Sequence, residues 1–188
     1  VEAGRRSGSL RFLSRWPRSL PGTQLHKTDG LAAIVRQLQG WEAPAPAWEC
    51  GLFAARLKGY SSGWLDGLCL SGEMMWGRLS PHPSLQLETA AEAPRRRIRP
   101  TRAAPIAIFP RESVPWLIQT QGHETPPGLS PAALRIRDVL ATRGACFFND
   151  LVRFSGALPS EVEDAVWELV SAGEITSDGF ENLRALID

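Results

Sequence analysis

An arginine-rich segment in the middle of the chain carries the clearest candidate chemistry. Guanidinium groups stay charged and bind phosphate oxygens well, so a dense run of them favours salt-sensitive contacts to a nucleic-acid backbone, independent of base sequence. We predict such contacts for this run and for one arginine on the strand expected before it. The alternative is a solvated basic loop without a ligand. The residues are Arg95, Arg96, Arg97, Arg99 and Arg102 in the run, and Arg78 before it.

The sequence lacks the residue patterns of the common catalytic sites. A Gly-x-x-x-x-Gly-Lys-Ser/Thr loop, which binds nucleotide phosphates, does not occur, and neither does an acidic motif to hold magnesium. His26, His82 and His123 fall in loop-like segments without the spacing of metal ligands, and the three cysteines are far apart. We therefore predict no catalytic residue, no metal site and no cofactor in this chain.

The C-terminal part, residues 129–188, has the pattern of three helices followed by a wing. Ser130 is expected to cap the first helix and Gly144 to end it. Ser160 and Glu163 have the spacing of a capping box, which predicts the start of the third helix. A strand over 174–176, a turn after it and a short last helix would complete a compact helix-turn-helix unit.

The preceding part of the chain repeats this order of elements. Three helices are expected first, then a strand over 73–79, and a second strand over 105–109 could return beside it across a long wing loop at 80–104. We therefore predict an α+β fold of two tandem winged-helix domains. The expected division is a basic N-terminal segment at 1–27, a first domain with a long basic wing loop at 28–120, a linker at 121–128 and a second domain at 129–188.

The third helix of the C-terminal unit is acidic, although this is the helix that reads the major groove in many helix-turn-helix proteins. It contains no lysine or arginine, and carboxylates would repel the phosphates beside a groove. We predict that this helix contacts a neighbouring domain or a protein partner instead. The residues assigned to that contact are Glu161, Asp164, Trp167 and Glu168, with a place in the core as the alternative for Trp167.

Composition limits the class of protein further. Hydrophobic residues make up 43% of the chain, enough for real cores, and no run approaches the roughly 18 apolar residues that would span a bilayer. The three cysteines do not form a disulfide framework, so we expect a reduced, cytoplasmic setting and no membrane partner. Because the chain begins with Val1, we expect it to be a piece of a longer protein.

An ordered series of short patterns over residues 28–188 resembles the large helicase-related family. The resemblance implies a bacterial ATP-dependent helicase, a hydrolase, in which two motor domains that bind ATP and magnesium precede winged-helix domains. DNA would be the partner rather than RNA, and DNA repair or processing the setting. The patterns include Trp48-Glu49, Ala55-Arg56-Leu57, Trp64-Leu65-Asp66, Trp76-Gly77-Arg78, Pro105-Ile-Ala-Ile108, Trp116-Leu117, Phe147-Phe148-Asn-Asp-Leu151 and Glu161 to Val170.

From these observations we expect a non-catalytic accessory part of a helicase, which grips nucleic acid without sequence preference and contacts the motor domains of the parent chain. One alternative is an architectural module for self-association or protein docking. A second alternative is part of a glycosylase-like enzyme that excises DNA bases, in which Asp66 and Glu73 would come together as a carboxylate pair. We favour the simpler interpretation that Asp66 faces solvent on its helix.

Overall fold

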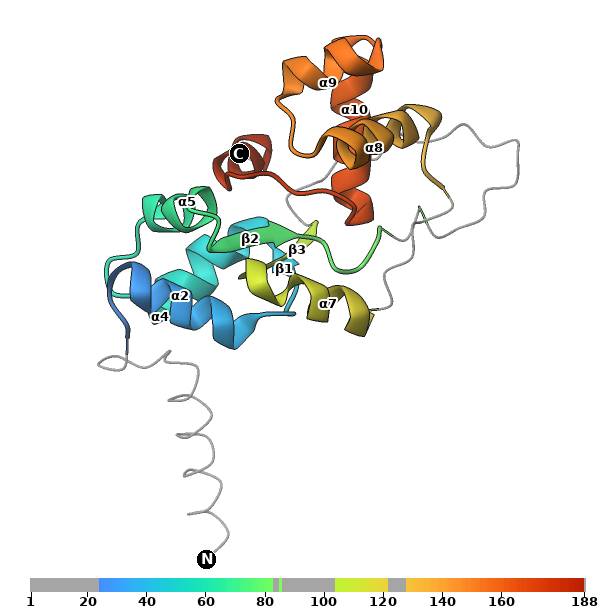
Figure 1. The fold of residues 1–188 in the computed structure, drawn as a ribbon. Helices are drawn as coiled ribbons and strands as arrows, with labels where there is room; N and C mark the ends of the chain where they lie inside the picture. Colours follow the sequence, from blue (N-terminus) through green and yellow to red (C-terminus); the bar gives the residue numbers. More distant parts are fainter. Residues whose placement is uncertain (1–23, 83–84, 86–103, 122–127, 188) are drawn as a thin grey trace, which may run out of the picture.

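The computed structural model describes residues 24–82, 85, 104–121 and 128–187. A first unit combines helices with a small sheet, a second unit consists of three helices above it, and the last helix returns to the first unit (Figure 1). The predicted α+β class is confirmed. The first unit contains α2 (Lys27–Leu38), β1 (Ala43–Pro44), α3 (Ala45–Ala47), η1 (Trp48–Phe53), α4 (Ala54–Arg56), α5 (Ser62–Leu70), β2 (Met74–Gly77), β3 (Pro105–Pro110), η2 (Arg111–Ser113) and α7 (Val114–Gln121).

The sheet of the first unit is antiparallel, with strand order β1-β3-β2. β3 returns beside β2 as predicted, with Met75 opposite Phe109 and Trp76 opposite Ile108. The continuous apolar run of β3 is explained by its central position, because Ile106 to Pro110 are all buried. Most of the connection between these two strands, where the wing loop at 80–104 was predicted, lies outside the described residues, so the path of the loop stays a prediction.

The sequence pattern predicts a regular α-helix for the second helical segment of the first unit, but the structure differs. The middle of this segment, η1, is a π-helix. In an α-helix, residues five apart point about 140° away from each other, whereas the i→i+5 bonding of a π-helix brings them close to one side. Trp48 and Phe53 are five apart and both fully buried, with ring centroids 5.5 Å from each other. The wider turn thus lets both aromatic rings enter the core.

The second unit consists of α8 (Pro131–Arg143), α9 (Phe148–Ser155) and α10 (Pro159–Ala172). Ser130 caps α8 as predicted, and its Oγ accepts the Ala133 N–H at 3.1 Å. The predicted capping box at Ser160 and Glu163 is wrong. Pro159 occupies the first helical position, where its fixed φ suits a helix, so Leu158 is the N-cap and donates its N–H to the Glu161 carboxylate at 3.1 Å.

The predicted wing strand of the C-terminal unit is also wrong, because residues 174–176 are irregular. This segment lies against β2, which is an edge strand of the sheet. The Thr176 hydroxyl donates to the Trp76 carbonyl, and the Trp76 indole Nε1–H donates to the Gly179 carbonyl at 3.1 Å. The segment thus covers the sheet edge through side-chain hydrogen bonds and does not add a strand.

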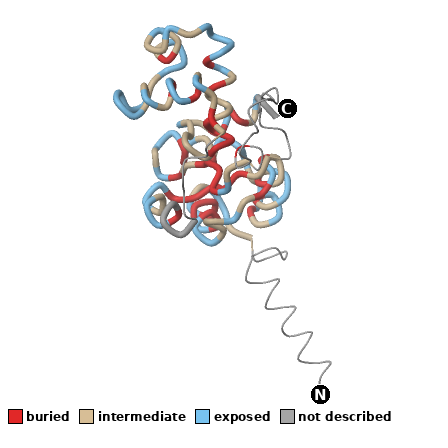
Figure 2. The backbone as a smooth tube through the Cα atoms, turned by 90° about the vertical axis from the view of Figure 1, so that its right-hand side faces the viewer, coloured by how far each residue is buried: buried red, intermediate tan, exposed pale blue. Residues whose placement is uncertain are grey.

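The last helix, α11 (Glu181–Ile187), does not close the second unit as expected, but belongs to the core of the first. Phe180 and Leu183 are buried there with Trp76 and Trp48, whereas Leu169 of α10 is buried among α8 and α9. Figure 2 shows buried backbone concentrated in the first unit and along the chain that joins the two units. The three-helix unit is therefore inserted between two parts of the chain that share one core.

Candidate nucleic-acid interface and contacts between the units

The arginine run at 95–102 lies outside the described residues, so the structure places only one of the predicted phosphate ligands. Arg78 follows β2 and is only 6% exposed, with its Nε–H donated to the Ser80 carbonyl at 3.2 Å. Burial lowers the pKa of this guanidinium, opposed by the charge of Glu42. Arg78 thus has little exposed surface to offer a phosphate, and its predicted contact with nucleic acid stays a prediction.

Glu42 holds the start of the connection that leads to the arginine run. Its Oε1 accepts the backbone N–H groups of Leu79 at 2.8 Å and Ser80 at 3.2 Å. These N–H groups come directly after β2, where the strand has stopped pairing with β3. The carboxylate therefore takes the place of a strand partner and fixes the direction in which the chain leaves the sheet.

The acidic helix α10 uses several of its predicted contact residues inside the chain. Glu168 accepts the Ser130 N–H and hydroxyl, both at 2.6 Å, and so joins α10 to the N-terminus of α8. Glu161 is exposed and caps its own helix, and Asp164 is half-buried. Trp167 is half-buried and packs against the core of the first unit. The described geometry gives Glu161, Trp167 and Glu168 roles within the fold, while a contact with another protein stays a prediction.

A charged cluster fastens α11 to the first unit. The Arg184 Nε donates to Glu49 Oε2 at 2.8 Å, and its terminal nitrogens reach both oxygens of Asp66 at 3.3 Å. Tyr60 donates its hydroxyl to Glu49 Oε1 at 2.7 Å. Hydrogen bonds to Glu49 raise the pKa of the Arg184 guanidinium, and burial together with the bond to Glu49 raises the pKa of the Tyr60 hydroxyl. The cluster therefore stays charged at Arg184 and protonated at Tyr60 throughout the neutral range.

Asp66 and Glu73, the carboxylate pair considered from the sequence, are not brought together. Asp66 is bound to Arg184, and Glu73 forms a separate ion pair with Arg36 at 2.9 Å. The simpler expectation that Asp66 only faces solvent is also wrong, since it is half-buried in the Arg184 cluster. Two carboxylates that each bind an arginine on different elements do not form an acid–base pair.

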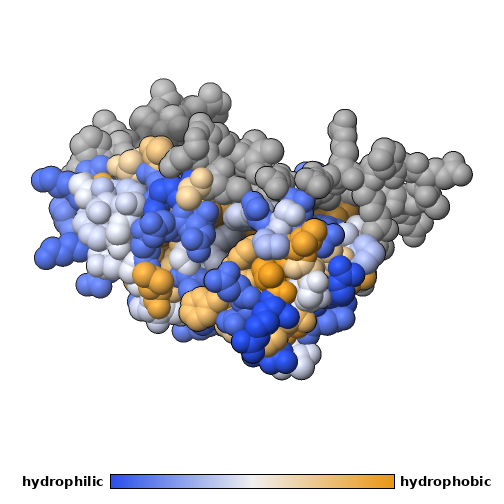
Figure 3. Space-filling model, turned by 90° about the horizontal axis from the view of Figure 1, so that it is seen from above, coloured by the Kyte–Doolittle hydropathy of each residue, from blue (hydrophilic) through white to orange (hydrophobic). Residues whose placement is uncertain are grey.

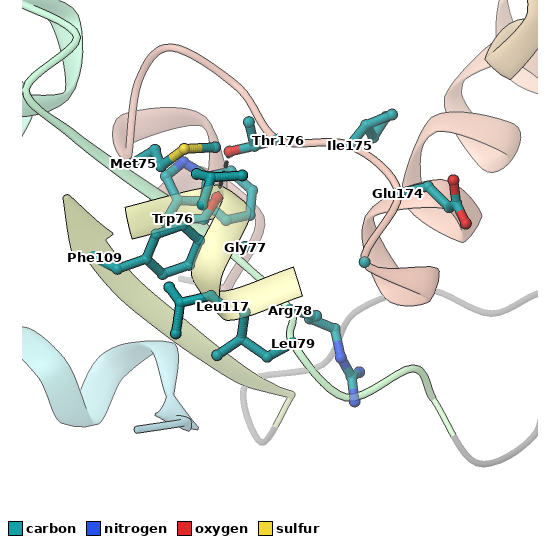
Figure 4. A pocket seen from close by; sticks show the side chains of 12 residues that line it. Met75, Trp76, Gly77, Arg78, Leu79, Phe109, Leu117, Glu174, Ile175 and Thr176 are labelled. Carbon is teal, nitrogen blue, oxygen red and sulfur yellow. Dashed lines mark hydrogen bonds between the residues drawn. The ribbon is translucent and has the colours of Figure 1, made fainter. Parts of the chain in front are cut away.

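A small cavity lies between the sheet and the segment that follows α10 (Figure 4). The side chains of Trp76, Phe109 and Leu117 form its apolar wall, Thr176 closes one side, and Arg78 points away from that wall. Its volume of about 160 Å³ is below the range of roughly 300–1,000 Å³ that is usual for small-molecule sites. The cavity is better explained as imperfect packing between the sheet and this segment.

Within the described ranges, no three His, Cys, Asp or Glu side chains come close enough to bind a metal ion. None of the described helices has the length and apolar character needed to cross a membrane.

Two exposed arginines that the sequence interpretation did not single out lie on the second unit. The guanidinium carbons of Arg143 and Arg153 lie 3.8 and 5.0 Å from the ring centroid of Phe154. The sequence carries a signal for this part of the second unit. Phe147 and Phe148 place two large aromatic residues at a helix start, where a small polar cap is usual.

These observations define an α+β protein of the winged-helix class, and sequence comparison identifies the family. The model of the winged-helix domain of large helicase-related proteins matches residues 5–91. A "Lhr helicase/ probable uracil glycosylase" of Mycolicibacterium smegmatis is 31% identical in an alignment of 183 residues that covers 94% of this chain and 10% of that protein. The "Lhr helicase/uracil glycosylase" of Escherichia coli is 29% identical in an alignment of 171 residues that covers 84% of this chain and 10% of that protein.

The chain belongs to the large helicase-related family, as a winged-helix region, and the resemblance found in the sequence is confirmed. It spans about a tenth of the length of the curated relatives that it matches. The family match begins at residue 5, inside the segment that was expected to precede the first domain.

Proposed function

We propose that this chain is a non-catalytic accessory region of an ATP-dependent helicase, which contacts nucleic acid independently of base sequence and positions neighbouring domains. The observation that carries the proposal is the chemistry of α10. The helix in the groove-reading position has no cation, and its Glu168 is committed to Ser130 on α8. A region that does not read bases suits a motor that must move along any sequence.

The position of the arginine run supports phosphate contact. The run falls in the connection between β2 and β3, which is the place of a wing, and Glu42 directs how that connection begins. Its five guanidinium groups would bind the DNA backbone, while ATP and magnesium would belong to the motor domains of the parent chain. In this proposal the protein works in the cytoplasm, in DNA repair or processing.

A salt titration of DNA binding tests the proposal. We expect the 188-residue chain to bind single-stranded and duplex DNA with a strong dependence on salt concentration. Replacing Arg95, Arg96, Arg97, Arg99 and Arg102 together with alanine is expected to weaken both and to reduce the salt dependence. Changing Arg78 alone is expected to affect folding more than binding, since it is buried. Unchanged DNA affinity in the variant with all five substitutions would contradict the proposed binding of DNA by the arginine run.

A purely architectural role is the second candidate, favoured by the way α10 packs. Trp167 and Val170 on this helix contact the core of the first unit, while Leu169 lies in the core of the second. A region that holds domains together through helix packing would not need to bind DNA for this role. A stable multimer in light scattering, combined with no binding to either form of DNA, would favour this function over the first.

Base excision is the third possibility, because the relatives are described as uracil glycosylases as well as helicases. The carboxylates that come together among the described residues, Glu49 and Asp66, both bind Arg184, so neither is poised as a general base. We expect no release of uracil from DNA by this chain alone. Measurable release would overturn the non-catalytic proposal.

A further inference from the structure

The outer end of the second unit combines exposed aromatic rings with arginines. Phe147 is 84% exposed and directly precedes α9, and Phe148 follows it as the first residue of that helix. Arg143 at the end of α8 and Arg153 on α9 are both exposed. Seen from above, the face over α8 and α9 presents strongly hydrophobic and strongly hydrophilic side chains next to each other (Figure 3).

The two arginines are held in place by an aromatic ring and not by carboxylates. Both guanidinium groups lie close to Phe154, at 3.8 and 5.0 Å from its centroid, which fits cation–π contact. Within the described ranges, no carboxylate forms an ion pair with Arg143 or Arg153. Their charge is therefore oriented on the surface and available to an anion.

Phe147 occupies its position against the local preference of the backbone. It is the N-cap of α9 and makes no side-chain capping bond, although serine, threonine, aspartate or asparagine would stabilise this end of the helix. A ring that is 84% exposed contributes nothing to the core either. A residue that serves neither the helix nor the packing is expected where function sets the choice.

The acidic residues that neighbour this surface in the sequence do not cancel its charge. Asp150 is half-buried in the first turn of α9, where a carboxylate is stabilised by the N-terminal end of the helix dipole. On α8, Asp138 is paired with Arg137 at 3.8 Å. The patch therefore presents two cations and two exposed rings.

We propose that Phe147, Phe148, Arg143 and Arg153 form a binding surface for single-stranded nucleic acid, separate from the arginine run. Unpaired bases stack on Phe147 and Phe148, and the two guanidinium groups contact the adjoining phosphates. Duplex DNA buries its base faces and cannot use the rings. The proposal deepens the proposed function by naming an unpaired strand as the preferred partner, and it rests on residues that the arginine run does not share.

Fluorescence anisotropy with a labelled oligothymidylate and a labelled mixed-sequence duplex tests the surface in the 188-residue chain. Phe147→Ala is expected to weaken binding of the oligothymidylate about tenfold, within the usual effect of losing one stacked base, and to change duplex binding less than about twofold. Phe147→Trp keeps a stacking face and is expected to restore affinity.

The arginines are tested through the salt dependence. Arg143→Gln combined with Arg153→Gln is expected to make the slope of log affinity against log salt shallower by about 1.4 for the single strand, about 0.7 for each charge. Lys58→Gln removes an exposed charge on the first unit and serves as a matched control, with no change in slope expected.

Leu158 supplies the control for simple hydrophobicity. It is 65% exposed, caps α10 as Phe147 caps α9, and has no aromatic face. Leu158→Ala is expected to leave binding of the oligothymidylate unchanged, and circular dichroism is expected to show the same thermal unfolding for all these variants.

Three results would overturn the proposal. They are unchanged affinity of Phe147→Ala for the oligothymidylate, equal losses for single strand and duplex, and equal losses for Phe147→Ala and Leu158→Ala, which would indicate an apolar docking surface for protein. Loss of binding in the arginine-run variant with no effect of Phe147→Ala would contradict this proposal alone. Weaker binding of Phe147→Ala, with unchanged binding of the arginine-run variant, would contradict only the proposed binding of DNA by the arginine run.

Discussion

Arg184 and Glu49 join the end of the chain to its first unit. The Arg184 Nε donates to Glu49 Oε2 at 2.8 Å, although the two residues are separated by 135 positions in the sequence. The same guanidinium reaches Asp66 on α5, so one side chain on α11 binds both η1 and α5. The chain that leaves the three-helix unit after α10 is thereby fastened to the first unit through α11.

We expect Arg184→Gln to destabilise the chain by about 1–3 kcal/mol, because two carboxylates that are largely buried would lose their cation. Glu49 is 15% and Asp66 23% exposed. The matched control is Arg36→Gln, since the pair of Arg36 with Glu73 is about half exposed and is expected to contribute less than about 1 kcal/mol. Urea unfolding followed by circular dichroism measures both changes. Equal losses of unfolding free energy in the two variants would contradict the idea that burial makes the Arg184 cluster more stabilising.

Phe180→Ala is expected to destabilise the first unit by about 3–5 kcal/mol, the usual cost of removing a buried phenyl ring. Phe180 is fully buried against Trp76, with ring centroids 6.3 Å apart. Intrinsic tryptophan fluorescence during unfolding reports this loss. A loss below about 1 kcal/mol would show that α11 does not belong to the first core.

Glu168→Ala is expected to cost about 1–2 kcal/mol, because the N-terminus of α8 would lose a charged hydrogen-bond acceptor. Both bonds from Ser130 to this carboxylate are 2.6 Å long. Ser160→Ala serves as the comparison, since Ser160 is exposed and is not the cap of α10. A loss for Ser160→Ala as large as that for Glu168→Ala would contradict a start of α10 at Pro159.

Alkaline pH is expected to destabilise the fold through buried acids. Burial raises the pKa of the Cys69 thiol from 9.0 to about 12. Between these values the unfolded chain releases the thiol proton while the folded chain keeps it, so the free energy of unfolding falls as pH rises from 9 towards 12. Tyr60 acts in the same direction, because its pKa is raised as well.

The slope of stability against pH isolates the contribution of the thiol. Cys69→Ala is expected to make the slope above pH 9 shallower in urea titrations at several pH values. Cys50→Ala is the matched control, because it removes an exposed thiol in place of a buried one. Equal slopes for wild type and Cys69→Ala would show that the thiol titrates alike in both states.

Local chemistry was enough to predict much of the secondary structure. Ser130 caps α8 and Gly144 ends it, because a serine oxygen satisfies free N–H groups and glycine accepts the positive φ of 79° that follows the helix. The apolar run of β3 indicated a strand that could return beside β2. The lack of cations in α10 also follows from the sequence alone, and so does the inference that this helix is unsuited to a groove.

Tertiary contacts decided the features that the sequence interpretation missed. The π-helix at Trp48–Phe53 exists because two rings enter one core, and Arg184 meets Glu49 and Asp66 only when α11 returns to the first unit. The segment at 174–176 has the composition of a strand, yet it does not pair with β2. Hydrogen bonds of Thr176 and Gly179 with Trp76 hold this part of the chain against the edge of β2. Residue type and spacing determine local elements, whereas contacts between residues more than a hundred positions apart depend on how the chain folds back on itself.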